Sequence, residues 1–61
     1  MNYKKMKQLR EAAGMTQTEL GEKVLVGQTM IARVEAGVKE PSLSLLGRIA
    51  EALGVETAEL L

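Results

Sequence analysis

The sequence contains no cysteine and no histidine, and these two absences exclude several kinds of chemistry. Without cysteine there are no disulfides, no thiol nucleophile and no thiolate metal site. Without histidine, the commonest general base and metal ligand is also missing. A glycine-rich phosphate-binding loop is absent too, and 61 residues leave little room for an enclosed active site. We therefore expect no enzymatic activity and no cofactor or metal.

Aromatic residues and long apolar runs are equally scarce. Tyr3 is the only aromatic residue, so a core must be built from Leu, Ile, Val, Met and Ala. The apolar content of 46% is nevertheless too high for a disordered chain. No segment has the features of a signal peptide or a membrane span. These properties predict one small domain, residues 1–61, in a reducing cytoplasm, with no membrane or small-molecule partner.

The chain also lacks an excess of either charge, because eight basic and eight acidic residues cancel. The charges are unevenly spread: residues 1–10 contain four basic and no acidic residues, and residues 51–61 contain three acidic and no basic residues. A neutral total is not typical of a nucleic-acid-binding protein, since contacts with phosphate supply most of the nonspecific affinity. Any nucleic-acid interface must therefore depend on local groups.

Apolar periodicity and capping residues predict five short helices and thus an all-α fold. The clearest start is Thr16 with Glu19, which forms the pattern of a capping box. Gly14, Gly37 and Gly54 stand where helices are expected to end. The predicted helices, each with its N-capping residue, are 3–13 (Asn2), 17–24 (Thr16), 28–36 (Gly27), 43–53 (Ser42) and 58–61 (Thr57).

The predicted helix 28–36 has two different faces. Met30, Ile31 and Val34 gather on one side. The opposite side carries polar side chains and two small residues, namely Gln28, Thr29, Ala32, Arg33 and Ala36. The major groove of DNA admits one α-helix, and Gln, Arg and Thr side chains can bond base edges there. An ordinary solvated helix face looks similar, so this helix alone does not decide between the two interpretations.

The preceding helix favours the DNA-reading interpretation. Helix 17–24, a break of three residues and helix 28–36 have the lengths of a helix-turn-helix motif spanning about 17–36. Gly21 is small where the two helices must cross closely. The positions that such a crossing buries are all apolar, namely Leu20, Val24, Val26, Ile31 and Val34. The combination is much more specific than any single residue.

Over about Met6 to Leu61 the chain resembles the lambda-repressor-like (Xre/Cro-type) helix-turn-helix domains. The resemblance is carried by "LREAAGMTQTELGEKV", "IARVEAG" and "PSLSLLGRIAEALGV". It implies a compact five-helix domain that places helix 28–36 in the major groove of double-stranded DNA. It further implies a bacterial or phage-type regulator, associated with the nucleoid, that binds a two-fold symmetric operator as a homodimer. We expect a transcriptional repressor.

The resemblance also implies roles for individual residues. The positions expected to read bases are Gln28, Thr29, Ala32 and Arg33, and those expected to contact phosphate are Gln17, Thr16 and Lys39. Arg10 and Glu35 are expected to form a partly buried structural ion pair between the first and third helices.

Three residues depart from the pattern of the family. Leu25 stands in the turn where the family usually has glycine in a left-handed conformation, which costs a non-glycine residue about 1–2 kcal/mol unless the turn is remodelled. Gly27 replaces the usual Ser or Thr cap of the third helix. Met30 replaces a common small hydroxyl residue, and we expect it to fill the core.

Two alternatives stay open. The apolar residues Val55, Leu60 and Leu61 form a dimer surface, or Leu60 completes the core and Leu61 frays. The domain could also be a protein-interaction module, an adaptor or antitoxin-like partner with weak or no DNA binding. The neutral charge and Gly27 favour that alternative, whereas Gln17, Gln28 and Arg33 favour DNA.

Overall fold

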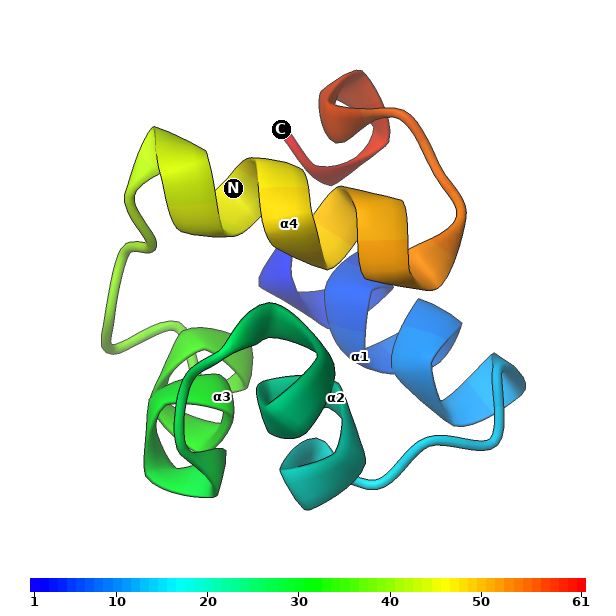
Figure 1. Ribbon diagram of the computed structural model, residues 1–61. Coiled ribbons are helices and arrows are strands. Elements are labelled where there is room, and N and C mark those ends of the chain that lie inside the picture. Colours follow the sequence, from blue (N-terminus) through cyan, green and yellow to red (C-terminus); the bar gives the residue numbers. More distant parts are fainter.

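The computed structural model describes residues 1–61 and is all-α, as expected from the sequence (Figure 1). Its elements are α1 (Tyr3–Ala12), α2 (Gln17–Val24), α3 (Gln28–Glu35), α4 (Leu43–Leu53) and a short 3-10 helix, η1 (Thr57–Leu60). In Figure 1, α4 lies across one side of the molecule, with α2 and α3 below it and η1 above it. None of the helices has the length and apolar content that crossing a lipid bilayer would require.

The predicted number of five α-helices is wrong, because the structure has four. The last segment is a single 3-10 turn that follows Glu56, and Thr57 is its first residue and not its cap. Its backbone bonds run from Glu59 N–H to the Glu56 carbonyl and from Leu61 N–H to the Ala58 carbonyl, three residues apart. Such short 3-10 turns are frequent at the ends of helical segments, and this one buries Leu60.

Ten apolar residues form the core, and every element contributes to it. The core residues are Met6, Leu20, Val24, Ile31, Val34, Leu45, Leu46, Ile49, Ala50 and Leu60. The inward positions predicted for the helix-turn-helix motif are among them, while Val26 and Met30 are half-buried against the core. In α4, Leu45 is buried and Leu53 is half-buried.

The two ends of the chain meet beside this core. The backbone N–H of Asn2 donates to the carbonyl of Leu60 over 2.6 Å. Close by, Lys5 Nζ lies 3.6 Å from Glu59 Oε1. Since the side chain of Leu60 is completely buried, the last turn both fills the core and holds the start of α1.

The caps of the helices follow the sequence pattern closely. The side chains of Asn2, Thr16 and Ser42 each accept a hydrogen bond from the backbone three residues later, at 3.0–3.1 Å. Glu19 Oε1 completes the capping box by accepting from the backbone N–H of Thr16 over 2.9 Å. Gly27 caps α3 without a side-chain bond.

Because of this capping box, we expect Glu19 to make stability depend on acid pH. The hydrogen bond from the Thr16 backbone, followed by that with the Thr16 side chain, lowers the pKa of Glu19 below its ordinary value. A lowered pKa in the folded state stabilises the protein above the unfolded-state pKa, and this contribution is lost as pH falls through the folded-state value. Urea unfolding between pH 7 and pH 3 should therefore show a shallower acid loss for Glu19→Gln than for the wild type. An identical profile in both proteins would contradict this role.

The turn between α2 and α3 holds Leu25 in the left-handed conformation that the family pattern implies, with φ 65° and ψ 37°. Leu25 is the only non-glycine residue with a positive φ. Its side chain is 80% exposed, so little apolar burial offsets the strain of the backbone. The turn is thus not remodelled around the missing glycine.

We therefore expect Leu25→Gly to stabilise the domain by about 1 kcal/mol, the relief of left-handed strain less the entropy of a more flexible unfolded chain. The midpoint of urea unfolding should rise at unchanged slope. Gly54→Ala is the matched control with the opposite change. Gly54 has φ 72° and nothing lies within 4 Å of the added Cβ, so the substitution adds backbone strain without a steric clash. That variant should lose a similar free energy. A lower midpoint for Leu25→Gly would refute the assignment of strain.

Candidate nucleic-acid interface

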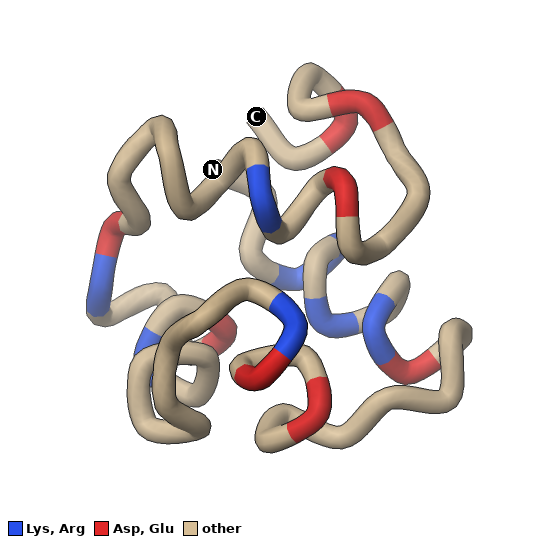
Figure 2. The backbone as a smooth tube through the Cα atoms, in the orientation of Figure 1, with Lys and Arg blue, Asp and Glu red and all other residues tan.

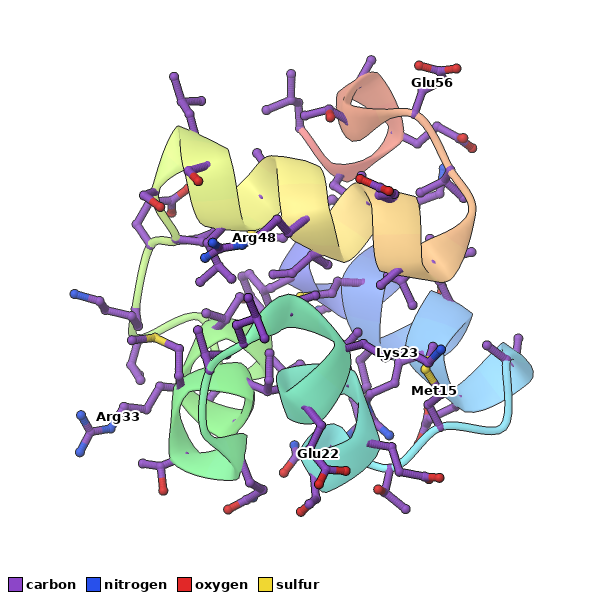
Figure 3. All side chains as sticks on the ribbon, viewed as in Figure 1. Met15, Glu22, Lys23, Arg33, Arg48 and Glu56 are labelled. Carbon is purple, nitrogen blue, oxygen red and sulfur yellow. The ribbon has the colours of Figure 1, made fainter.

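The third helix has the two faces expected from its sequence. Ile31, Val34 and Glu35 are buried against α1 and α2, whereas Gln28, Thr29 and Arg33 are exposed and Ala32 is half-buried between them. Figure 3 shows Arg33 extending from α3 away from the body of the molecule. The exposed face therefore presents amide, hydroxyl and guanidinium groups around a small residue that lets a broad ligand approach.

The N-terminal ends of α2 and α3 lie at the same edge of the molecule. Gln17 and Gln28, the first residues of the two helices, are joined by a hydrogen bond from Gln28 Nε2 to Gln17 Oε1 of 2.7 Å. The free backbone N–H groups and the dipoles of helix N-termini favour an anion. Thr16 caps α2 at this edge, its Oγ1 accepting from Glu19 N–H. The edge thus has the polarity of a phosphate contact.

The angle between α2 and α3 depends on a close backbone contact. A Cβ added to Gly21 would lie 2.7 Å from the carbonyl oxygen of Val26 and 3.3 Å from the carbonyl carbon of Gly27. The backbone N–H of Val26 also donates to the carbonyl of Gly21 over 2.9 Å. The structure therefore explains the small residue at this position, since a side chain would push the turn and α3 away.

Behind the exposed face, a buried ion pair joins α1 to α3. Arg10 Nε donates to Glu35 Oε2 over 2.6 Å, and Arg10 Nη2 donates to Glu35 Oε1 over 3.1 Å. Arg10 Nη1 also donates to the carbonyl of Met15 over 2.7 Å. The hydrogen bonds with Glu35 raise the pKa of Arg10 above its ordinary value, despite the opposing effect of burial. The ion pair implied by the resemblance is thus present, and it supports α3 from within.

One link in this arrangement was missed by the sequence reasoning. Gln17 Nε2 donates to Glu35 Oε1 over 3.1 Å, so the side chain expected to contact phosphate is also tied to the buried ion pair. Neither periodicity nor capping signals this bond, because it joins residues 18 positions apart. Only the packing of α2 against α3 brings them together.

Cations near the exposed face are few (Figure 2). Arg33 lies on α3, and Lys39 lies in the following loop, directly beside Glu40. Glu40 Oε1 in turn lies 3.5 Å from the N-terminal amino group. With a net charge of zero, this face offers a small number of specific cations and no broad basic surface.

The C-terminal apolar residues do not act as one surface. Leu60 is completely buried, so the alternative in which it completes the core is confirmed, and its place in the predicted dimer surface is wrong. Val55 is half-buried against the core, and only Leu61 is largely exposed, at 72%. Leu43 at the start of α4 is 83% exposed and was not singled out from the sequence. Large exposed apolar side chains therefore lie both at the start of α4 and at Leu61.

Comparison with known proteins identifies the fold and the motif. The sequence profile of the helix-turn-helix family matches residues 6–60. An HTH-type transcriptional regulator of Methanothermobacter thermautotrophicus is 48% identical over 50 residues, which cover 82% of this chain and 72% of that protein. The chain therefore belongs to the helix-turn-helix family, and its resemblance to the lambda-repressor-like members is confirmed.

Solved structures agree with this assignment. SinR in its complex with SinI superposes with a TM-score of 0.92 at 29% identity, over all of this chain but only 60% of that one. The clp gene regulator ClgR from Corynebacterium glutamicum gives a TM-score of 0.90 at 31% identity, over 95% of this chain and 62% of that one. The master regulator for biofilm formation SinR, in complex with DNA, gives a TM-score of 0.90 at 28% identity, over 98% of this chain and 97% of that one. These relatives support a DNA-binding transcription regulator.

Proposed function

We propose that this domain reads double-stranded DNA by placing α3 in the major groove. The observation that carries the proposal is the exposed row of Gln28, Thr29 and Arg33 on a helix whose other face is locked into the core. These side chains read base edges, and the small Ala32 lets the helix sit close to them. The structure of SinR with DNA, which superposes on 98% of this chain, supports the same use of the fold.

The contacts that position the domain on DNA come from neighbouring elements. Thr16 and Gln17 at the N-terminus of α2, together with Lys39 after α3, contact the phosphates. Such contacts fix register and orientation, whereas base contacts confer specificity. Because the chain is neutral overall, we expect weak nonspecific binding and a shallow dependence of affinity on salt.

The domain acts, in this proposal, as a cytoplasmic transcriptional repressor and as a homodimer. Two recognition helices related by a two-fold axis match half-sites one helical turn apart. Exposed Leu43 and Leu61 are the residues on which such a dimer would bury apolar surface.

Selection of bound duplexes from a random DNA pool, at low and at near-physiological salt, tests this function. We expect enrichment of an inverted repeat with half-site centres about 10 base pairs apart. Enrichment of a single half-site would retain DNA reading and remove the dimer. No enrichment at either salt, with the domain shown to be folded by circular dichroism, would leave protein recognition as the function.

Arg33→Ala and Lys39→Ala separate base reading from phosphate binding. Arg33→Ala should cost about 1–3 kcal/mol and relax specificity at one base pair, because one base-edge contact is lost. Lys39→Ala should weaken binding to all sequences alike and reduce the salt dependence. Dissociation constants for the selected operator and its single-base variants give both effects. If Arg33→Ala weakened binding to every duplex equally, Arg33 would not be one of the base-reading residues.

A further inference from the structure

A hollow of about 440 Å³ lies between the last turn of α2 and the middle of α4. It is lined by Lys23 of α2 and by Arg48, Glu51 and Ala52 of α4. Arg48 and Glu51 are the only charged residues of α4, and both lie at this one place. The hollow is therefore a charged site, in contrast to the largely apolar pockets that hold small-molecule ligands.

The three charged side chains that line the hollow make no ion pair within the protein. The ion pairs of the structure join Met1 to Glu40, Lys5 to Glu59 and Arg10 to Glu35. Glu19 lies one turn before Lys23 on α2, but its carboxylate accepts from the backbone N–H of Thr16 over 2.9 Å. The two cations of the hollow are thus left free for a ligand.

The balance of charges in the hollow indicates the chemistry of that ligand. A guanidinium binds a carboxylate through two parallel hydrogen bonds, and a nearby ammonium adds a second positive charge. Glu51 opposes Arg48 and Lys23, so two positive charges and one negative charge leave a net charge of +1. This balance suits a single carboxylate better than duplex DNA, which carries one negative charge per about 1.7 Å of its axis.

The surface of α4 beside the hollow is open to a polypeptide. Ser44 and Gly47 lie one helical turn before Arg48 and Glu51, so the four residues share one side of α4. Ser44 and Gly47 are both small, and nothing lies within 4 Å of a Cβ added to Gly47. A chain can therefore lie along α4 with one of its side chains in the hollow.

We propose that the hollow between α2 and α4 receives an acidic side chain of a partner protein, held by Arg48 and Lys23. The hollow lies at the opposite end of α2 from Gln17. In Figure 3, Arg48 lies along α4, apart from Arg33, which extends from α3. The partner thus binds while the exposed face of α3 stays free.

Titration with an acidic peptide tests this proposal. The probe is acetylated and amidated hexaglutamate, and hexaglutamine is the uncharged control of the same length. Nuclear magnetic resonance of the nitrogen-15-labelled domain follows the backbone amides. We expect hexaglutamate to shift the amides of Lys23 and of residues 48–52, and hexaglutamine to shift none of them. Shifts spread equally over all basic residues would overturn the proposal, because they would reflect unspecific attraction.

Single substitutions locate the binding site. Lys23→Gln and Arg48→Gln should each weaken binding of hexaglutamate about threefold, the effect of one exposed ion pair. Glu51→Gln should strengthen it by a similar factor, because a repelling carboxylate is removed. Lys7→Gln is the matched control, since Lys7 is an exposed lysine of α1 outside the hollow, and it should bind as the wild type does. An equal loss in Lys7→Gln, or no gain in Glu51→Gln, would overturn the assignment.

Two further measurements distinguish a protein partner from other anions. Inorganic phosphate should shift the same amides less than hexaglutamate does at equal concentration, and Arg48→Gln should bind the selected operator as tightly as the wild type. Larger shifts with phosphate would make the hollow a small-anion site, and weaker operator binding would make it a DNA contact. Either result would overturn the proposal. The peptide titration uses the free protein, so its outcome does not depend on whether the domain reads DNA.

Discussion

Arg10→Met is expected to destabilise the domain by about 3 kcal/mol, near the lower end for breaking a buried ion pair. The substitution removes three hydrogen bonds, two to Glu35 and one to the carbonyl of Met15. It also leaves the carboxylate of Glu35 buried without its counter-charge, which costs more than the net value of the pair. A domain of this size is stable by only a few kcal/mol, so much of the variant should be unfolded at room temperature. Urea unfolding followed by circular dichroism measures the loss.

A double variant distinguishes the stranded charge from lost packing. Arg10→Met/Glu35→Met removes both charges and replaces them with apolar side chains, an exchange that is often neutral in proteins. We expect the double variant to be more stable than Arg10→Met alone. A double variant less stable than the single one would show that hydrogen bonding, and not the unpaired charge, dominates. Loss of DNA binding in Arg10→Met then reflects unfolding, since Arg10 lies behind the exposed face.

Gly21→Val is expected to destabilise the domain by about 3 kcal/mol, the upper part of the usual range for overpacking. The first added carbon meets the carbonyl oxygen of Val26 at 2.7 Å, and the two methyl groups of valine add further contacts. Because the obstructing atoms belong to the backbone, α3 must move relative to α2 to accommodate the valine side chain. Both unfolding by urea and binding to the selected operator should therefore be affected.

Gly47→Val is the control for this substitution. Gly47 also lies within a helix, but nothing lies within 4 Å of a Cβ added there. Because valine has the higher helix propensity, the control should be at least as stable as the wild type. If Gly21→Val and Gly47→Val had the same unfolding midpoint, the close crossing of α2 and α3 would not limit the residue at position 21.

The sequence was sufficient for most of the helix-turn-helix motif because its signals are local. The capping box of Thr16 and Glu19 and the apolar periodicity of α3 each depend on neighbouring residues, whereas the left-handed turn at Leu25 was expected only from the resemblance to the family. Helix boundaries followed for the same reason and differ by one residue at the ends of α1 and α3. The residues on the polar face of α3 could therefore be identified from the sequence alone.

The features that the sequence did not reveal depend on contacts between distant residues. The bond from Gln17 to Glu35 requires α2 and α3 to be packed, and nothing in either helix signals it alone. The final turn was predicted as an α-helix capped by Thr57, but Glu56 is the cap and the segment is a short 3-10 turn that buries Leu60. The burial of Leu60 similarly removed it from the predicted dimer surface.

The bond between Asn2 and Leu60 has a consequence for synthesis on the ribosome. The chain emerges from its N-terminus, so the start of α1 is exposed long before its partner in the last turn exists. The core stays open until Leu60 has cleared the exit tunnel, because that side chain is one of the completely buried ones. A nascent chain stalled before this residue has left the tunnel should therefore remain sensitive to protease, and α3 should become rigid only once Leu60 can join the core.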